Sequence, residues 1–397
     1  MGVVFLQFAD YFMFAAVFRN RTMKLPTLYS MKSTFKAVLM LFLVVLSTVF
    51  SASANHDEAH ATATESHEPA KFDAAKMIME HILDAHDWHL WGEHHSAVSI
   101  PLPVILYSDK GLDVFMSSEF HHGEATVHGK YDYKLAERKI EVVNADGTLN
   151  EAATAGLYDF SITKNVMSLF ISIFVVLLVF LPIASKYKAN PNTAPSGLQS
   201  LLEPIILFIK DNVAIPNIGE KKYERYMPFL LTVFFFILTN NLLGLIPFFP
   251  GGANVTGNIS IPFTLASIVL IIILVTGNKH YWQHMLAMPG VPKPILIILT
   301  PIEILGFIIR PFVLMIRLFA NITAGHIVIL SFISMIFILG ASSAAAGYGV
   351  SIFSMFLVVF MLTLELLVAF LQAYVFTLLS SIYFGSAVEE AHHDDHH

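Results

Sequence analysis

The second half of the chain consists of long apolar stretches separated by short charged loops. Val166 to Ala184 is 19 residues without a charge, and Tyr226 to Pro247 and Ile261 to Thr276 follow as further apolar runs. A helix of about 20 apolar residues crosses a bilayer. Each of these three stretches therefore predicts one membrane-spanning helix.

The last two apolar stretches are too long for ordinary spans. At 1.5 Å per residue, Ile295 to Leu339 would measure about 67 Å and Val350 to Phe384 about 52 Å, against a hydrocarbon core of about 30 Å. The small residues GASSAAAGYG between them predict a tight turn near Ala345. We expect an antiparallel hairpin of two helices that tilt strongly or lie nearly in the membrane plane, with bends permitted at Pro301 and Pro311.

Between the first two predicted spans, apolar and polar residues alternate with a helical period. Apolar residues at 198, 201, 202, 205 and 209 lie opposite Gln199, Glu203 and Lys210. This pattern predicts an amphipathic helix in the membrane interface. Lysines and arginines at 186, 188, 221, 222, 225 and 279 mark the cytoplasmic loops, because positive residues favour that side.

The first half of the chain has a different character. Residues 31–54 combine a charged start, an apolar stretch and the small residues Ala52-Ser53-Ala54, which is typical of a cleaved signal peptide. Residues 1–30 then read as a mis-assigned start or an extension. Residues 55–163 are polar and include alternating patches such as YDYKLAERKIEVV that suggest strands. We expect a small periplasmic domain there, a membrane domain at 164–388 and a cytoplasmic tail at 389–397.

Composition agrees with this organisation. The chain is 55% hydrophobic and only 13% charged, which indicates a polytopic membrane protein. It lacks cysteine, so thiol chemistry is excluded, and a net charge of −7 without a basic tract argues against nucleic acid. The predicted fold is an all-α membrane protein: about five membrane helices, an interfacial helix and the small external domain.

Most of the 18 histidines lie in the predicted external domain, at positions that include 56, 60, 67, 81, 86, 89, 94 and 95. Their spacing matches no metal-ligand template. We therefore expect solvated histidines rather than a metal site.

Arg317 lies in the middle of the first long apolar stretch. Placing a guanidinium, which stays protonated, near a bilayer centre costs roughly 2.5 to 3.5 kcal/mol. Glu303, Arg310 and Arg317 are spaced by seven and Asn321 follows by four, so all four share one helix face. Glu303 and Arg310 lie near the cytoplasmic end and could snorkel to the interface. Arg317 and Asn321 are too deep for that, which favours a functional site.

A second polar group is expected across the hairpin. His326 is nine residues past Arg317 and so faces another side of the helix. Counting from a turn near Ala345, His326 and Glu365 fall at similar depth, and Gln372 falls near the depth of Arg317. A histidine and a carboxylate titrate within reach of physiological pH, as a proton relay requires. A structural His/Glu pair is the alternative.

The string TPIEILGFIIRPFVLMIRLFANITAGHIVIL resembles the signature of subunit a of F-type ATP synthases, which carries R-L-F-x-N-x-x-A-G. NNLLGLIP at 240–247 and LELLVAFLQAYVFTLLSSIYF at 364–384 extend the resemblance. Many bacterial members place an acid after the A-G pair and a histidine on the last helix. Here the order is swapped, as His326 and Glu365, an order that resembles mitochondrial members.

The resemblance implies a non-catalytic stator subunit of an inner-membrane ATP synthase, without cofactor or metal. Its partners would be the c-ring, the subunit b peripheral stalk, the F1 sector and membrane lipid. Arg317 matches the essential arginine that faces the ring carboxylate. Asn321 and Gln372 match polar residues beside it, and Glu303 and Arg310 match charged residues near the inner half-channel. Two proton half-channels against the ring would couple proton flow to rotation.

Two other classes of protein stay open. An intramembrane hydrolase would need a nucleophile and a base at membrane depth, yet neither GxSxG within a span nor HExxH occurs. A secondary transporter would show two related halves, and no internal repeat is apparent. Proton transport is favoured over sodium by the titratable pair.

Overall fold

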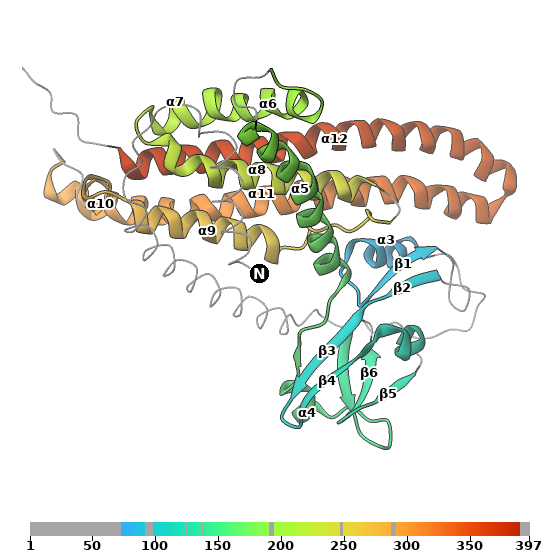
Figure 1. Cartoon of the computed structure of the whole chain (residues 1–397). Helices are drawn as coiled ribbons and strands as arrows, with labels where there is room; N and C mark the ends of the chain where they lie inside the picture. The colour runs from blue at the N-terminus through green and yellow to red at the C-terminus, as the bar shows by residue number, and fades with distance from the viewer. Residues whose placement is uncertain are drawn as a thin grey trace, which may run out of the picture.

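The computed structural model describes residues 73–91, 98–123, 125–136, 138–189, 194–246, 249–286 and 291–389 (Figure 1). Within them, a small domain containing strands lies at one side of a bundle of long helices, below it in the view of Figure 1. The predictions for the signal segment, for residues 1–30 and for residues 390–397 fall outside the described residues.

The N-terminal domain, which we call the β domain, is built from short antiparallel strands. Its sheets have the orders β1-β2, β4-β3-β8 and β5-β6-β7. Its elements are α3 (Ala74–Ile82), β1 (Asp87–Trp91), β2 (Val98–Pro101), β3 (Pro103–Ser108), β4 (Gly111–Met116), η2 (Ser117–Gly123), β5 (Thr126–His128), β6 (Asp132–Ala136), β7 (Lys139–Val143), α4 (Glu151–Ala155) and β8 (Tyr158–Asp159). The all-α description therefore holds only for the second half of the chain.

Alternation within YDYKLAERKIEVV is the reason for the β6–β7 hairpin. Tyr133 pairs with Val142 and Leu135 with Ile140, so the apolar residues of both strands point to one face. Tyr133 and Val142 are fully buried in the core of the domain, together with Val104, Leu106 and Phe120. The strands expected from this patch are confirmed.

Every regular element in the described part of the second half of the chain is a helix. Its elements are α5 (Lys164–Ala189), α6 (Leu198–Ile209), the π-helical turn η3 (Lys210–Ala214), α7 (Ile215–Ile218), α8 (Tyr223–Leu245), α9 (Ser260–Thr276), α10 (Lys279–Leu286), α11 (Lys293–Ser342) and α12 (Ala344–Val388). Of these, α5, α8, α11 and α12 are long and apolar enough to cross a membrane. The bent pair of α9 and α10, which meet at 105°, would add a fifth span.

Helix α8 is the centre of the bundle. It packs against α5 and α12, and 56% of its most apolar 18-residue window is buried, compared with 11% for α11. Phe234, Leu230 and Ile237 of α8 are fully buried in the main hydrophobic core. Most of the apolar surface of α11 is left for lipid or another subunit to cover.

Helices α11 and α12 form the long antiparallel hairpin that the sequence predicts (Figure 1). Ser343 is the turn residue, and its side chain accepts a hydrogen bond from the backbone N–H of Ala346, which caps α12. Small residues let the helices converge here, because a Cβ on Gly347 would lie 2.8 Å from the Cα of Gly340. Helix α11 continues through both Pro301 and Pro311.

The predicted helix is present as α6, and its position in the membrane interface stays a prediction. Ile206, Ile209 and Gln199 are buried, whereas Leu198 is 55% and Leu201 65% exposed. Residues 199, 202, 206 and 209 follow the helical period, so α6 packs this side on the bundle. Leu198 and Leu201 of the predicted apolar face are left uncovered by this chain.

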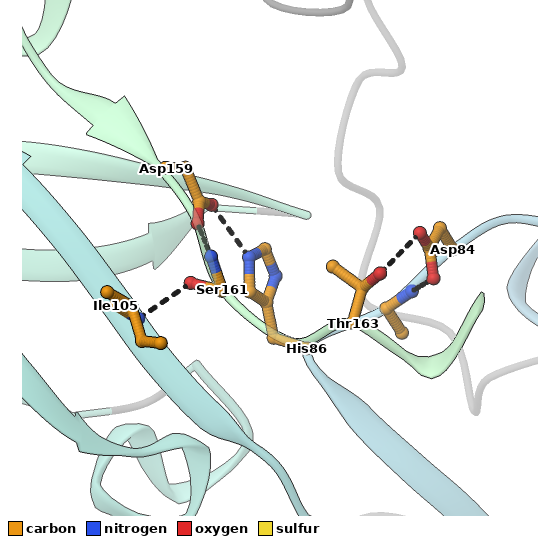
Figure 2. A network of polar contacts seen from close by, with 7 residues as sticks. Asp84, His86, Ile105, Asp159, Ser161 and Thr163 are labelled. Atoms are coloured by element: carbon orange, nitrogen blue, oxygen red, sulfur yellow. Dashed lines mark hydrogen bonds and ion pairs between the residues drawn. The ribbon is translucent and has the colours of Figure 1, made fainter. Parts of the chain in front are cut away.

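A polar network joins the β domain to the first turn of α5 (Figure 2). Asp84 accepts hydrogen bonds from the Thr163 hydroxyl at 2.7 Å and from the backbone N–H of Asn165 at 3.0 Å. The backbone N–H of Lys164 donates to the carbonyl of Ala85 at 2.9 Å. These contacts satisfy N–H groups that a helix leaves unpaired at its N-terminus, so the β domain caps α5.

The same junction buries a histidine that we expected in solvent. His86 is 7% exposed, and its Nε2 lies 2.9 Å from a carboxylate oxygen of Asp159. Burial by itself would raise the pKa of Asp159, but hydrogen bonds with His86 and Ser161 outweigh it and leave the pKa below its ordinary value. The expectation of solvated histidines is therefore wrong for His86, although it holds for the exposed His81 and His89.

Candidate functional site

A short polar contact joins α11 to α12 across the hairpin. His326 Nδ1 lies 2.6 Å from a carboxylate oxygen of Glu365. The two side chains are 17% and 4% exposed, so both are shielded from solvent. The pairing expected from residue counting along the hairpin is confirmed. Its role in proton transfer stays a prediction.

Gly325 makes room for this pair. A Cβ at position 325 would lie 2.8 Å from the paired oxygen of Glu365 and 3.1 Å from its carboxyl carbon. Only glycine permits so close an approach of the carboxylate to the α11 backbone. The other carboxylate oxygen of Glu365 is buried and has no hydrogen-bond partner among the described residues. One buried carboxyl group thus has one partnered and one open oxygen, an arrangement suited to receiving or passing on a proton.

A buried polar cluster that the sequence did not reveal lies next to the pair. The Thr256 hydroxyl donates to Asn241 at 2.8 Å, and the Asn241 amide donates to the carbonyl of Ala369 at 3.3 Å, one helical turn beyond Glu365. Asn254 is also buried, and its amide nitrogen lacks a partner in the described part of the chain. The only signal in the sequence was the adjacent pair Asn240-Asn241 inside an apolar run.

Arg317 and Asn321 lie on the outer surface of α11. Both are exposed, and Arg317 makes no hydrogen bond or ion pair with the described residues. The surface around them is apolar or small: Ile316 is 42% and Val313 38% exposed, and Ala320 is exposed as well. Among the described residues this permanent cation has neither a hydrogen-bond nor an ion-pair partner, although Tyr383 is near enough to feel its charge. It stands on a largely apolar face next to a small residue that would let another helix approach closely.

Gln372 does not join Arg317 in this chain. It is 5% exposed and faces the interior of the bundle. No hydrogen bond connects it to Arg317 or Asn321 among the described residues. The expectation of similar depth is compatible with this placement, but the two side chains do not form one polar site.

Glu303 and Arg310 line a cavity of about 230 Å³ between α10, α11 and the end of α12. The guanidinium of Arg310 lies 5.8 Å from the centre of the Tyr383 ring, within the range of a cation–π contact. Both charged residues are half-buried. They thus border an internal space as well as the surface, which simple snorkelling does not require.

No group of three or more His, Cys, Asp or Glu side chains gathers into a metal site within the described residues. His56, His60, His67, His94 and His95 lie outside them.

Comparisons with known proteins agree with these features. A family model described as ATP synthase A chain matches residues 166–385, and another, described as a domain of unknown function, matches residues 77–160. An ATP synthase subunit a from Chlorobium phaeobacteroides is 40% identical over 293 residues, covering 70% of this chain and 82% of the relative.

Two further relatives have the same kind of name. ATP synthase subunit a 2 of Chlorobaculum tepidum is 45% identical over 245 residues, which is 60% of this chain and 66% of the relative. ATP synthase subunit a of an Anaeromyxobacter species is 39% identical over 250 residues, which is 61% of this chain and 58% of the relative. The matched region contains the His326–Glu365 pair and Arg317, which has no ion-pair partner among the described residues. The chain belongs to the subunit a family of F-type ATP synthases.

Proposed function

We propose that this chain is the proton-translocating stator of the Fo sector, with two half-channels that meet the c-ring at Arg317. A c-ring carboxylate must be neutral while it faces lipid and ionised while it exchanges its proton. A permanent cation favours the ionised form, and arginine does this without releasing a proton itself.

The exposure of Arg317 carries this proposal. A buried arginine would find its partner within the chain, whereas this guanidinium has none among the described residues and stands on the least covered of the long helices. Its cost in lipid, roughly 2.5 to 3.5 kcal/mol, calls for an acidic partner on another subunit. Asn321, one turn further along the same exposed face, supplies a neutral polar group at the same contact.

The remaining site residues fall into two groups, one for each half-channel. We assign His326 and Glu365 to the outer half-channel, since they pair at 2.6 Å and adjoin the buried cluster of Asn241 and Thr256. Glu303 and Arg310 are assigned to the inner half-channel because they line the cavity at the other end of α11. Gln372, buried between the groups, would orient waters or neighbouring side chains.

Two separate half-channels would force each proton to ride the rotor between them. Each charge that crosses a potential of 100 mV releases about 2.3 kcal/mol, so several protons per turn supply the free energy for ATP formation in F1. Subunit b would hold this stator to F1 through the peripheral stalk. The titratable pair favours protons over sodium as the coupling ion.

The proposed topology follows the positive loops. Residues 164–388 would lie in the cell inner membrane, with the β domain in the periplasm and residues 389–397 in the cytoplasm. The helix ends agree with this arrangement, since Lys186 and Lys188 lie in the last turn of α5 and the β domain adjoins its first turn. The hairpin of α11 and α12 would tilt strongly, because at 50 residues α11 is about 75 Å long.

The decisive experiment replaces Arg317 in the assembled ATP synthase. Arg317→Ala should abolish ATP-driven proton pumping in proteoliposomes, measured by quenching of a pH-sensitive dye, while ATP hydrolysis by F1 continues. Ile316→Ala, at the adjacent exposed position, should pump normally. Normal coupled pumping by the Arg317→Ala complex would refute the proposal. Purification of a functional monomer without ring or F1 subunits would point to a transporter or hydrolase instead.

A further inference from the structure

The cavity that adjoins Arg310 contains two histidines that the proposed function leaves unused. His280 and His284 lie one turn apart on α10, with ring centres 6.4 Å apart, and both line the cavity together with Glu303 and Arg310. A volume of about 230 Å³ holds several water molecules. The walls combine imidazole, carboxylate and guanidinium groups around a space that water can fill.

Helix α10 is fixed in place by contacts at both of its ends. Just before it, the backbone N–H of Asn278 donates to the carbonyl of Ala387 at 2.8 Å, and the Asn278 amide donates to the carbonyl of Val388 at 3.0 Å. At its other end, the Thr300 hydroxyl of α11 donates to the carbonyl of Leu286 at 3.0 Å. The two histidines are therefore held against α11 and α12 by the fold itself.

The charged and titratable groups around the imidazoles come from every neighbouring element. Helix α11 contributes Glu303 and Arg310 to the cavity wall, and the residue after α12 contributes Glu389. Tyr281 of α10 is the other titratable residue that lines the cavity. Nearby, the Tyr383 ring of α12 lies 5.8 Å from the Arg310 guanidinium, and Lys279 is exposed at the start of α10. Two carboxylates and one guanidinium therefore offer polar partners to both the protonated and the neutral imidazole.

We infer that His280 and His284 are proton-exchange groups at the mouth of the inner half-channel, which transfer protons between aqueous buffer and Glu303. Histidine is the side chain whose charge ordinarily changes between about pH 5 and 8. A neutral imidazole takes a proton from a buffer acid, and the imidazolium passes it through cavity water to the Glu303 carboxylate. The histidine then returns to its neutral form, so charge and protons balance. This inference rests on the proposed function of the chain.

The function of such groups is to supply protons faster than free hydronium can. At neutral and alkaline pH free protons are scarce, and their concentration falls tenfold for each pH unit. Imidazoles that exchange with buffer molecules avoid this limit, because buffer acids are far more abundant than free protons. A path without them would depend on free protons or on a small buffer that enters the cavity.

The test uses the complete ATP synthase in proteoliposomes with F1 facing the bath, so that ATP-driven pumping takes protons from the inner side. With His280→Gln and His284→Gln combined, pumping in weakly buffered solution should fall by about tenfold between pH 7 and pH 8, because free protons become limiting. Added imidazole should restore it. The parent complex should pump at nearly the same rate with and without imidazole.

Gln283→Ala is the matched control, since Gln283 is exposed on the same helix but does not line the cavity. Its pumping should match that of the parent. Each single histidine variant should show a smaller loss that imidazole also restores, so the test does not depend on assembly of the double variant. Unchanged pumping by the double variant at pH 8, or a loss that imidazole fails to restore, would overturn the inference.

The two proposals fail in different ways. If Arg317→Ala pumps normally, the stator proposal itself is wrong. If Arg317→Ala is inactive while the histidine variants pump like the parent in weak buffer, the stator proposal stands and only the role of His280 and His284 is rejected.

Discussion

Arg317 and His326 lie nine residues apart on one helix, yet their surroundings are opposite. His326 is shielded and bound to Glu365 at 2.6 Å, whereas Arg317 is exposed and has no partner among the described residues. A polar group whose partner lies in the same chain can act as an internal relay. One whose partner is missing indicates contact with another molecule. Under the proposed function, the same helix carries an intramolecular site on one face and an intermolecular site on another.

Removing the carboxylic acid of Glu365 tests the pair that lies within the chain and should have the largest effect. Glu365→Gln keeps the shape but cannot exchange a proton, so we expect proton flux through the assembled complex to fall by about 100-fold, within the range for a lost acid–base group. Ser354→Ala, also buried on α12, is the control and should pump normally. Near-normal pumping by Glu365→Gln would make the pair structural.

Substitution of the neighbouring glycine tests how closely the pair must fit. Gly325→Ala places a methyl group against the Glu365 carboxylate, an overpacking that costs about 2 kcal/mol. If the methyl group forces His326 and Glu365 apart, proton flux through the complex should fall roughly thirtyfold. Gly306→Ala on the same helix meets nothing within 4 Å and serves as the control. Equal pumping by the two variants would show that the fit around Glu365 is unimportant.

A bulkier residue beside Arg317 tests whether another subunit packs against the exposed face of α11. Ala320→Leu meets open space in this chain, because Ala320 is exposed, and should leave the stability of the isolated subunit unchanged. Against a closely packed rotor helix it should cost about 1 kcal/mol, or roughly a fivefold loss of pumping. Leu366→Phe, on an exposed site of α12, gives a comparison of similar size. If the Ala320 variant pumps like the parent, no close partner touches this face.

The smallest effect is expected in the β domain, where Asp159 is paired but partly hydrated. The pKa of Asp159 is lowered in the folded protein, so its ionised form stabilises the fold. This contribution to the free energy of unfolding is fully present above the unfolded pKa of 3.8 and is lost as pH falls through the folded pKa. Because 36% of the side chain is exposed, we expect about 1 kcal/mol or less. Hydrogen exchange of β3 and β8 amides should show this acid dependence, and Asp159→Asn should remove it. An unchanged acid dependence in Asp159→Asn would contradict the assignment.

Residue counting predicted the hairpin and its polar pair, and the reason is geometric. The rise per residue of a helix is fixed, so positions at similar distances from a turn lie at similar depth. The turn is at Ser343 rather than near Ala345, so His326 lies 17 residues before it and Glu365 22 residues after it, yet the two side chains still meet at 2.6 Å. The helix boundaries also followed directly from the apolar runs, which ended within a few residues of the observed ends of α5, α8, α9 and α11.

Other features depend on tertiary packing that periodicity cannot report. The sequence did not indicate which face of α6 packs on the bundle, because its exposed leucines belong to the same apolar pattern as its buried isoleucines. His86 resembled its solvated neighbours until Asp159, 73 residues away, supplied a partner. Gly325 gave no sign that it touches Glu365. The cavity around His280 and His284 forms only where α10, α11 and the end of α12 meet.

The cap that Asp84 places on α5 has a thermodynamic consequence. Helix α5 cannot keep its first turn satisfied once the β domain unfolds, and the β domain cannot detach without exposing backbone N–H groups of Lys164 and Asn165. The two halves of the protein share these bonds, so they should melt cooperatively, in a single calorimetric transition rather than in two.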